Sequence, residues 1–426
     1  MKHLAVVGAG IGGCSAAYFA NQNIPNAKLT IYDAQKRVGG RILTQNAAGT
    51  NLELGASFIN STNKTILNII KSTQLKLTPA NESKDFAIWN GSEIIFRSNK
   101  TTLFTNLKLV SRYRLSIIRA LSLLREAKIE VAKLYRVQTE NPSEVAELFE
   151  SAGLSKWHKE TFDKILTEKG VSISFIDEIA EPITRTIYSQ DADLGGFAGI
   201  SSVIGVYGGP IYRLVEGNST LPAHLAQVSG ADVKLNQRVV SIEKTREDQF
   251  RISTGNEASL FDGVFVAAPL DLAGIAFDGV AKPAWEPLEY QKVYTRIAKG
   301  ILDPGYFGLQ ESAKLPAIVL TTKQADPVTH IAIQELGKGE SLVAVTSNKP
   351  LNESAFNGIF KGGGSPVLEH CWEAAYPKFK PVAKLPPTRL NERLFYLNSV
   401  EAAVSSMETT AFSALNAVKM MAAALR

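Results

Sequence analysis

The sequence contains very little cysteine and no clustered set of metal ligands. Cys14 and Cys371 are its only cysteines in 426 residues, so a disulfide framework is excluded. Neither cysteine has a CxxC neighbour that would favour a zinc or iron–sulfur site. The five histidines are scattered along the chain. We therefore expect no metal site and a reducing compartment.

Long apolar runs and a strong charge imbalance are also missing. No run of about 18 uncharged apolar residues occurs, which argues against a membrane-spanning helix. Met1-Lys2-His3 leads directly into an apolar segment, without the regions of a signal peptide, and we expect a cytoplasmic protein. The net charge of +5 is small for this length, and no nucleic-acid-binding motif accompanies it, so we expect no nucleic-acid partner.

A glycine-rich turn near the N-terminus is the most informative feature that is present. Residues 4–7 have the pattern of a buried strand, and the turn Gly8-Ala9-Gly10-Ile11-Gly12-Gly13 leads into a helix. Gly8 permits a tight turn, Gly10 lets backbone approach a diphosphate, and Gly13 lets the helix pack on the strand. Asp33 follows about 20 residues later, where its carboxylate can accept hydrogen bonds from a ribose. This spacing predicts a dinucleotide site in a Rossmann-like α/β domain.

Two further segments favour a flavin dinucleotide over a nicotinamide one. Arg37-Val38-Gly39-Gly40-Arg41 supplies a second glycine turn and two guanidinium groups close to Asp33. The segment 52–59 then reads as a short strand with small residues, Gly55, Ala56 and Ser57, that would let backbone pass close to a flat ring. We therefore predict FAD as the cofactor, with Gly8, Gly10, Gly13, Asp33, Gly39, Gly40, Arg41, Gly55, Ala56 and Ser57 in its site.

These segments resemble the FAD fold of the glutathione-reductase type and, within it, the flavin amine oxidases. Residues 174–190, 212–218 and 394–408 narrow the resemblance to the prenylcysteine oxidase, or prenylcysteine lyase, family. The chain departs from the flavin amine oxidase pattern at Ala56, where a second glycine is usual. It departs from the prenylcysteine oxidase pattern at Asn60, where a histidine is expected, at Ser219 in the turn after residue 217, and at Ser399, where a glycine is more typical.

The resemblance implies an FAD-binding domain built from separated segments, 1–75, 231–274 and 391–426, and a mixed α+β substrate domain from 76–230 and 275–390. Alternating residues between 232 and 269 predict a three-stranded meander whose last part returns to the main sheet, and Phe86 to Phe96 predicts a hairpin around Asn90-Gly91. The resemblance places Val239 at the adenine, and Ser399, Glu401 and Met407 near the flavin, where a helix start would direct its amide groups at the ring.

The implied reaction is the oxidation of an apolar thioether such as prenylcysteine. A hydride leaves the carbon next to sulfur and passes to the flavin, water hydrolyses the resulting cation to an aldehyde and free cysteine, and molecular oxygen reoxidises the flavin to give hydrogen peroxide. No catalytic residue can be named from the sequence. Arg185 is a candidate to hold the substrate carboxylate, with Tyr188 and Gln190 orienting it. An ion pair between Arg185 and Glu178 or Glu181 is the alternative.

Residues 103–136 interleave basic and apolar side chains in a helical pattern. Such a helix can lie on an anionic bilayer, which would suit an apolar substrate, or it can be a packed helix with a solvated basic face. The sequence leaves both interpretations open.

Two other functions compete with thioether oxidation. One is a flavin amine oxidase or a carotenoid-type desaturase on the same fold, although no aromatic cage can be placed from the sequence. The other is a non-catalytic flavoprotein that binds a lipid or a partner, which the departures at Ala56, Asn60 and Ser399 make conceivable.

Overall fold

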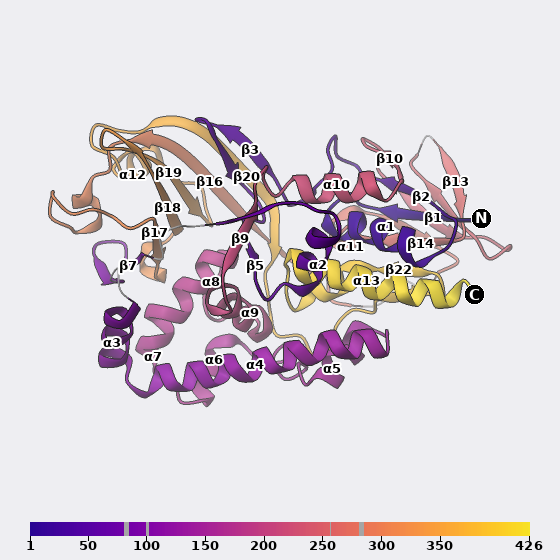
Figure 1. The fold of residues 1–426 in the computed structure, drawn as a ribbon, viewed down its shortest axis with the longest axis horizontal. Coiled ribbons are helices and arrows are strands. Elements are labelled where there is room, and N and C mark those ends of the chain that lie inside the picture. Colours follow the sequence, from indigo (N-terminus) through magenta and orange to yellow (C-terminus); the bar gives the residue numbers. More distant parts are fainter. Residues whose placement is uncertain (81–84, 99–101, 256, 281–284) are drawn as a thin grey trace.

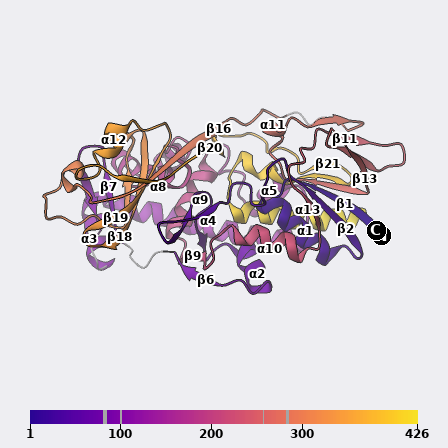
Figure 2. The ribbon, with the colours of Figure 1, turned by 90° about the horizontal axis from the view of Figure 1, so that it is seen from above.

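The computed structural model describes residues 1–80, 85–98, 102–255, 257–280 and 285–426, with the side chains of 102–107 outside the description. Two large sheets lie at opposite ends of an elongated molecule, and β16 (Tyr290–Gly300) and β20 (Ser365–Pro377) extend from one toward the other (Figure 1). The view from above shows the same separation (Figure 2).

A six-stranded sheet forms the half of the molecule that contains both termini (Figure 1). Neighbouring strands are parallel, except that the last strand is antiparallel to the one before it. The spatial order is β10 (Asp232–Lys234), β2 (Ala27–Tyr32), β1 (Lys2–Val7), β14 (Gly263–Val266), β22 (Leu394–Tyr396) and β21 (Arg389–Asn391). The predicted α/β fold class is thus confirmed, and the sheet draws on three stretches of chain that are far apart in sequence.

Side-chain alternation along β1 explains the layers around this sheet, because successive residues of a strand point to opposite faces. Leu4 and Val6 join the core shared with α1 (Ile11–Asn23), α10 (Thr220–Val228) and α13 (Met407–Ala424). Ala5 and Val7 join a second core on the other face, shared with the β-meander. Both faces of β1 are therefore buried, which accounts for its continuous apolar sequence.

The β-meander differs in part from its prediction. β11 (Ser241–Lys244), β12 (Phe250–Ser253) and β13 (Ala258–Phe261) are antiparallel neighbours, β15 (Ala276–Asp278) pairs with β11, and β14 returns to the main sheet as predicted. The first predicted strand, however, is split into β10 and β11, which belong to different sheets. Asn236 lies between them with φ +55°, a left-handed conformation that ends a strand. In the sequence, Gly255-Asn256 interrupts the predicted meander, and Asn256 lies outside the described residues.

A seven-stranded sheet forms the other half of the molecule. Its order is β20, β16, β19 (Glu340–Ser347), β18 (Val328–Gly337), β17 (Ile318–Thr321), β7 (Phe86–Trp89) and β8 (Ile94–Arg97). The pairing of β7 with β8 confirms the predicted hairpin, and Gly91 in its turn has φ +98°. Smaller sheets pair β3 (Thr44–Ala47) with β4 (Thr50–Glu53), and β9 (Ile211–Leu214) with β5 (Ile59–Asn60) and β6 (Leu77–Pro79).

Helices pack around one large apolar core in the lower part of the molecule in Figure 1. They include α5 (Val145–Ala152), α6 (Phe162–Glu168), α7 (Ile173–Phe175), α8 (Glu181–Tyr188) and α9 (Gly196–Tyr207), with a π-helical turn over Ile176–Ala180. The helical pattern predicted over 103–136 forms two helices, α3 (Thr102–Tyr113) and α4 (Leu115–Glu140). Arg114 separates them with φ +47°, which interrupts the helical hydrogen bonds. Shorter helices are α2 (Lys64–Ser72), α11 (Leu270–Ala273) and α12 (Glu353–Asn357).

Candidate functional site

The glycine turn, residues 8–13, connects β1 to α1. Gly8 has φ +108°, and a Cβ atom there would lie 3.0 Å from the Ala268 amide nitrogen. A Cβ at Gly13 would lie 1.8 Å from the Gly8 carbonyl oxygen, so the packing of helix on strand requires glycine. Gly10 differs from both: its φ of −76° suits any residue, and the nearest atom to a Cβ would be the Gly40 Cα at 3.8 Å. The protein itself does not need glycine at position 10, so the space beside it is available to a ligand.

The start of α1 presents donors to the same space. Within the described residues no side chain caps this helix, and its first turn contains no acidic residue. The first amide groups of a helix have no partner inside the helix, and they carry the positive end of its dipole. A diphosphate is the ligand that such a turn accommodates.

Asp33 lies at the end of β2 beside this turn. Its Oδ2 accepts a hydrogen bond from the Ala9 amide at 2.6 Å, and its Oδ1 accepts one from the Gln35 amide at 2.7 Å. An ionised carboxylate has about four acceptor positions, so two remain for the hydroxyl groups of a ribose. The side chain is only partly buried, which leaves it accessible to a ligand.

The second glycine turn packs directly against the first. The Gly39 amide donates to the Ala9 carbonyl at 2.8 Å, and Gly10 and Gly39 form a parallel bridge. The guanidinium group of Arg37 donates to the carbonyl groups of Gly40 at 2.6 Å and Ile42 at 3.0 Å. Arg37 therefore stabilises the turn through these carbonyl groups.

Arg41 faces a carboxylate from the C-terminal part of the chain. Its Nη2 contacts Oε1 of Glu401, which is fully buried, while the Arg41 side chain keeps 30% exposure. Glu401 also accepts a hydrogen bond from the Ser405 hydroxyl at 3.2 Å and one from the Tyr290 hydroxyl at 3.5 Å. Burial, followed by the charge of Glu401, raises the pKa of Tyr290, so this hydroxyl stays protonated as a donor.

The predicted small residues Gly55, Ala56 and Ser57 pass close to Arg41. A Cβ at Gly55 would lie 2.0 Å from the Arg41 carbonyl oxygen, and the Ala56 amide donates to that oxygen at 3.2 Å. Ser57 is exposed. Asn218 fixes the segment, because its side-chain amide donates to the Ala56 carbonyl at 2.9 Å.

The C-terminal strand and helix bring their own polar groups to this region. Ser399 is fully buried, with its hydroxyl 2.9 Å from that of Thr388. Met407 begins α13, whose first turn is capped by the Ser406 side chain, so fewer of its amide groups are free than the sequence suggested. Among the described residues, the side-chain oxygen of Asn398 is buried without a hydrogen-bond partner. A buried acceptor is costly unless a partner is supplied, and a bound cofactor would supply one.

Val239 lies in the short connection between β10 and β11. Its side chain is buried in the core shared by β1 and the β-meander, together with Val7 and Tyr32. Its backbone is therefore held beside the end of β2, where Asp33 stands. The adenine contact predicted for Val239 stays a prediction.

Two tyrosines that the sequence did not point to, Tyr290 and Tyr376, lie near the Arg41–Glu401 pair. Tyr290 comes from β16 and Tyr376 from β20, whose Ala375 carbonyl accepts a hydrogen bond from Arg41 at 3.3 Å. Tyr188 packs edge-on against Tyr376, with ring centroids 5.1 Å apart. Tyr290 and Tyr376 are distant in sequence, and the pairing of β16 with β20 brings them together. No local motif could have identified them.

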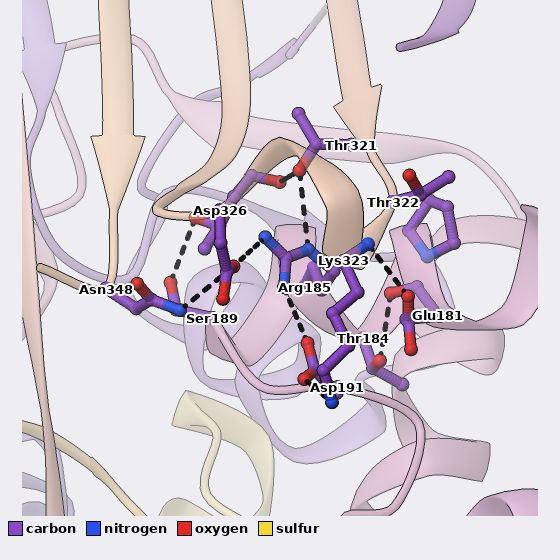
Figure 3. Close-up of polar contacts among 12 residues, drawn as sticks. Glu181, Thr184, Arg185, Ser189, Asp191, Thr321, Thr322, Lys323, Asp326 and Asn348 are labelled. Carbon is purple, nitrogen blue, oxygen red and sulfur yellow. Dashed lines mark hydrogen bonds and ion pairs between the residues drawn. The ribbon is translucent and has the colours of Figure 1, made fainter. Parts of the chain in front are cut away.

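Arg185 lies at the centre of a polar cluster between α8 and the seven-stranded sheet (Figure 3). Its buried guanidinium pairs with Asp191 at 2.5 Å and Asp326 at 2.6 Å, and donates to the Val328 carbonyl at 2.9 Å. A weaker contact at 3.4 Å joins its Nε to the Thr321 hydroxyl.

Arg185 therefore forms ion pairs, as the alternative prediction stated, but the predicted partners, Glu178 and Glu181, are wrong. Glu178 pairs with Arg112, and Glu181 accepts a hydrogen bond from the Lys323 amide at 2.9 Å. The predicted clamp on a substrate carboxylate has little support from this geometry, because the donors of Arg185 already have partners.

Tyr188 and Gln190 also make contacts within the protein. The Tyr188 hydroxyl donates to the Ser405 carbonyl at 3.0 Å. The Gln190 side chain accepts from the Phe379 amide and donates to the Pro377 carbonyl, both at 2.9 Å. These contacts hold the chain that follows β20 against α8. Their predicted role in orienting a substrate stays a prediction.

In the described part of the chain, no three histidine, cysteine, aspartate or glutamate side chains lie close enough together to bind a metal ion. Cys14 is fully buried in α1 and its thiol donates to the Ala9 carbonyl at 3.4 Å. Burial raises its pKa, so it is an inert thiol that packs as a small apolar side chain.

Comparisons with known proteins show which families this chain resembles. A family model described as prenylcysteine lyase matches residues 96–426, and one described as an NAD(P)-binding Rossmann-like domain matches residues 6–72. Farnesylcysteine lyase of Arabidopsis thaliana is 27% identical, over 98% of this chain and 87% of the relative. Prenylcysteine oxidase 1 of Homo sapiens is also 27% identical, over 97% of this chain and 87% of the relative.

Solved structures with the same fold include amine oxidases. Cyclohexylamine oxidase from Brevibacterium oxydans IH-35A superposes with a TM-score of 0.67 at 18% identity, covering 100% of this chain and 99% of that one. Wild-type putrescine oxidase bound to putrescine gives a TM-score of 0.64 at 14% identity, covering 100% and 98%. Identities this low establish a shared fold.

Proposed function

The chain belongs to the prenylcysteine lyase family, and on this premise we propose that it is an FAD-dependent oxidase that cleaves the thioether of a prenylcysteine. The products are free cysteine, an aldehyde from the prenyl group and hydrogen peroxide. The observation that carries the proposal is the family match over residues 96–426, which include most of the substrate region. The glycine turn, with open space beside Gly10, supports the cofactor.

The residues around the glycine turn fit FAD. The uncapped start of α1 would bind the diphosphate, and Asp33 would accept hydrogen bonds from the adenosine ribose. The buried acceptor of Asn398 and the exposed side of Arg41 lie on the segments where the sequence resemblance predicts the flavin. When bound, FAD supplies the two-electron acceptor for the hydride and later passes the electrons to oxygen.

The chain itself has to hold the substrate and limit water. We propose that the prenyl group lies against Tyr290 and Tyr376, whose half-buried rings flank Arg41 at the ends of two long strands. Aromatic rings offer apolar surface, and their hydroxyl groups can still donate hydrogen bonds. One water must reach the oxidised carbon, because hydrolysis of the sulfur-stabilised cation releases cysteine and forms the aldehyde.

Anaerobic addition of farnesylcysteine to the purified flavoprotein tests the proposal. The flavin absorbance should bleach, and admission of oxygen should restore it with release of hydrogen peroxide. Bleaching by cyclohexylamine or putrescine instead of the thioether would make the protein an amine oxidase, as the structural neighbours are. No bleaching by either class would leave a non-catalytic flavoprotein.

A cytoplasmic location and peripheral contact with a membrane through residues 103–136 are also part of the proposal. The location is supported by the two cysteines, which form no disulfide in the structure. Membrane contact is favoured by the substrate class, because prenylated molecules partition into lipid.

A further inference from the structure

The N-terminal half of α4 exposes large apolar side chains on the side away from the protein core. Leu115, Ile118, Leu121 and Ile129 are 59%, 62%, 58% and 51% exposed. Their spacing of three, three and eight residues places them along one stripe of the helix. In Figure 1, α4 runs along the lower edge of the molecule. We call this stripe, with the basic residues beside it, the α4 outer face.

The core of the protein does not require these side chains. Leu123, Leu124, Ala127 and Leu134 of α4 join the apolar core, and Leu123, Ala127 and Leu134 lie on the side of the helix opposite the stripe. The outer stripe is thus additional apolar surface on a helix that is already anchored. Val110 of α3 and Ile173 of α7, 50% and 71% exposed, extend it beyond the helix start. The Ser116 hydroxyl bonds the Ser172 hydroxyl at 3.0 Å, which places Ile173 next to that start.

Basic side chains accompany this apolar stripe. Arg114, Arg119, Arg125, Lys128 and Lys133 are all exposed. In the part of the chain that the structure describes, none of the five forms an ion pair with a carboxylate. The nearby carboxylates of Glu126 and Glu130 pair with Lys156 at 2.6 Å, away from the stripe. The face therefore presents positive charge that is not neutralised by the protein.

Arg125 and Lys128 also border a shallow hollow in this face. The residues around it are Leu121, Leu124, Arg125, Lys128, Ile129 and Ala132, so apolar and basic groups alternate around one depression. An anionic headgroup can pair with the cations of such a surface while an acyl chain contacts its apolar side chains.

We propose that the α4 outer face rests on the surface of an anionic lipid bilayer. The occupant follows from the charge: a second copy would bring the same unneutralised cations against one another, whereas anionic lipid would neutralise them. Within the described residues no helix is both long and apolar enough to cross a membrane, so the contact is peripheral. The inference gives the proposed oxidase access to a substrate dissolved in lipid, but binding to lipid does not depend on catalysis.

The test is co-sedimentation of the full-length protein with phosphatidylcholine vesicles that contain or lack phosphatidylserine. We expect binding only with phosphatidylserine, and loss of that binding at high salt. The double variant Ile118→Ser with Leu121→Ser and the single variant Arg125→Glu should each lower the bound fraction about tenfold. All three positions are exposed, so these variants keep the fold.

Matched controls come from exposed residues of the same types elsewhere. Leu272→Ser, at a site 50% exposed on α11, and Arg246→Glu, at an exposed site near β12, should bind vesicles as the wild type does. Equal binding of the α4 variants and these controls would overturn the proposal, as would equal binding to vesicles without phosphatidylserine. A wild-type dimer that Leu121→Ser dissociates would instead make the occupant a second copy.

The vesicle assay uses no substrate, so its failure is separate from failure of the oxidase proposal. Bleaching of the flavin by dissolved farnesylcysteine should be the same in wild type and in the α4 variants. If bleaching is lost while vesicle binding persists, the catalytic proposal fails and the lipid surface stands.

Discussion

Arg41 and Glu401 form an ion pair across 360 positions of sequence. The arginine follows the second glycine turn, and the glutamate lies in the 3-10 turn that follows β22. Glu401 is fully buried, whereas Arg41 reaches partly exposed surface beside the glycine turns. The pair thereby joins the N-terminal and C-terminal segments of the chain at the point where we place the cofactor.

Removing Arg41 should destabilise the protein more than neutralising its partner. Arg41→Ala leaves the Glu401 carboxylate buried with only the Ser405 and Tyr290 hydroxyls, and we expect a loss of about 3 kcal/mol of unfolding free energy. Glu401→Gln should cost about half as much, because Arg41 keeps access to water. Urea denaturation of the cofactor-free proteins measures both values. Equal costs would contradict the described asymmetry of burial.

Gly10→Ala should block the cofactor without harming the fold. The position has an ordinary φ and open space, so the methyl group is tolerated by the protein but projects toward the diphosphate. We expect FAD affinity to fall about 10- to 100-fold, as overpacking of a close contact costs about 1–3 kcal/mol.

The matched control is Gly205→Ala in α9, where a Cβ would meet only Phe58 at 3.8 Å. Fluorescence titration with FAD should give the wild-type affinity for this control, and thermal unfolding should show that both variants are folded. Wild-type affinity in Gly10→Ala would place the cofactor elsewhere.

Arg185 should prove to be a structural residue. Arg185→Met leaves Asp191 and Asp326 without their shared cation, and we expect a loss of about 3 kcal/mol in urea denaturation. Lys323→Met is the control, since the Lys323 side chain is 61% exposed and its pair with Asp191 should contribute less than about 1 kcal/mol. If Arg185→Met instead raises the KM for the substrate and leaves the unfolding free energy unchanged, Arg185 binds the substrate carboxylate.

Glu181 should make stability depend on pH. Burial raises its pKa from 4.5 to about 7, with Asp191 and Asp177 adding to the shift and Arg185 and the Lys323 amide opposing it. Between these two values the folded protein binds one more proton than the unfolded chain, so this contribution to stability is full below pH 4.5 and is lost as the pH rises to about 7.

Glu181→Gln removes this titration while keeping an oxygen that can accept from the Lys323 amide. The variant should gain stability relative to the wild type by up to about 3 kcal/mol across that pH interval. Urea denaturation at several pH values measures the difference. A difference that does not change with pH would show that Glu181 titrates normally.

The sequence predicted those parts of the site that depend on local spacing. The glycine turns and Asp33 are recognisable because a tight turn, a close backbone approach and a strand end each require a residue type at a fixed interval. The partners of Arg185 were not predictable in this way, since Asp326 lies 141 positions further along the chain. Tyr290 and Tyr376 escaped prediction for the same reason, because strand pairing alone brings them to Arg41.

The two errors in secondary structure have a common local cause. The split between β10 and β11 and the break between α3 and α4 each occur at a residue other than glycine with positive φ, Asn236 and Arg114. Alternation and helical periodicity continue across both positions in the sequence, so the pattern gave no sign of the break. At Asn236 a distant contact accompanies the turn, because its amide donates to the Gln35 carbonyl at 2.9 Å.

Titration of the purified, cofactor-free protein with FAD tests the central claim most directly. The account predicts one bound flavin per chain, a yellow complex and a higher unfolding temperature, with binding weakened in Gly10→Ala. A folded protein that remains colourless and binds no FAD would contradict the assignment of residues 8–13, Asp33 and Arg41 as a flavin site.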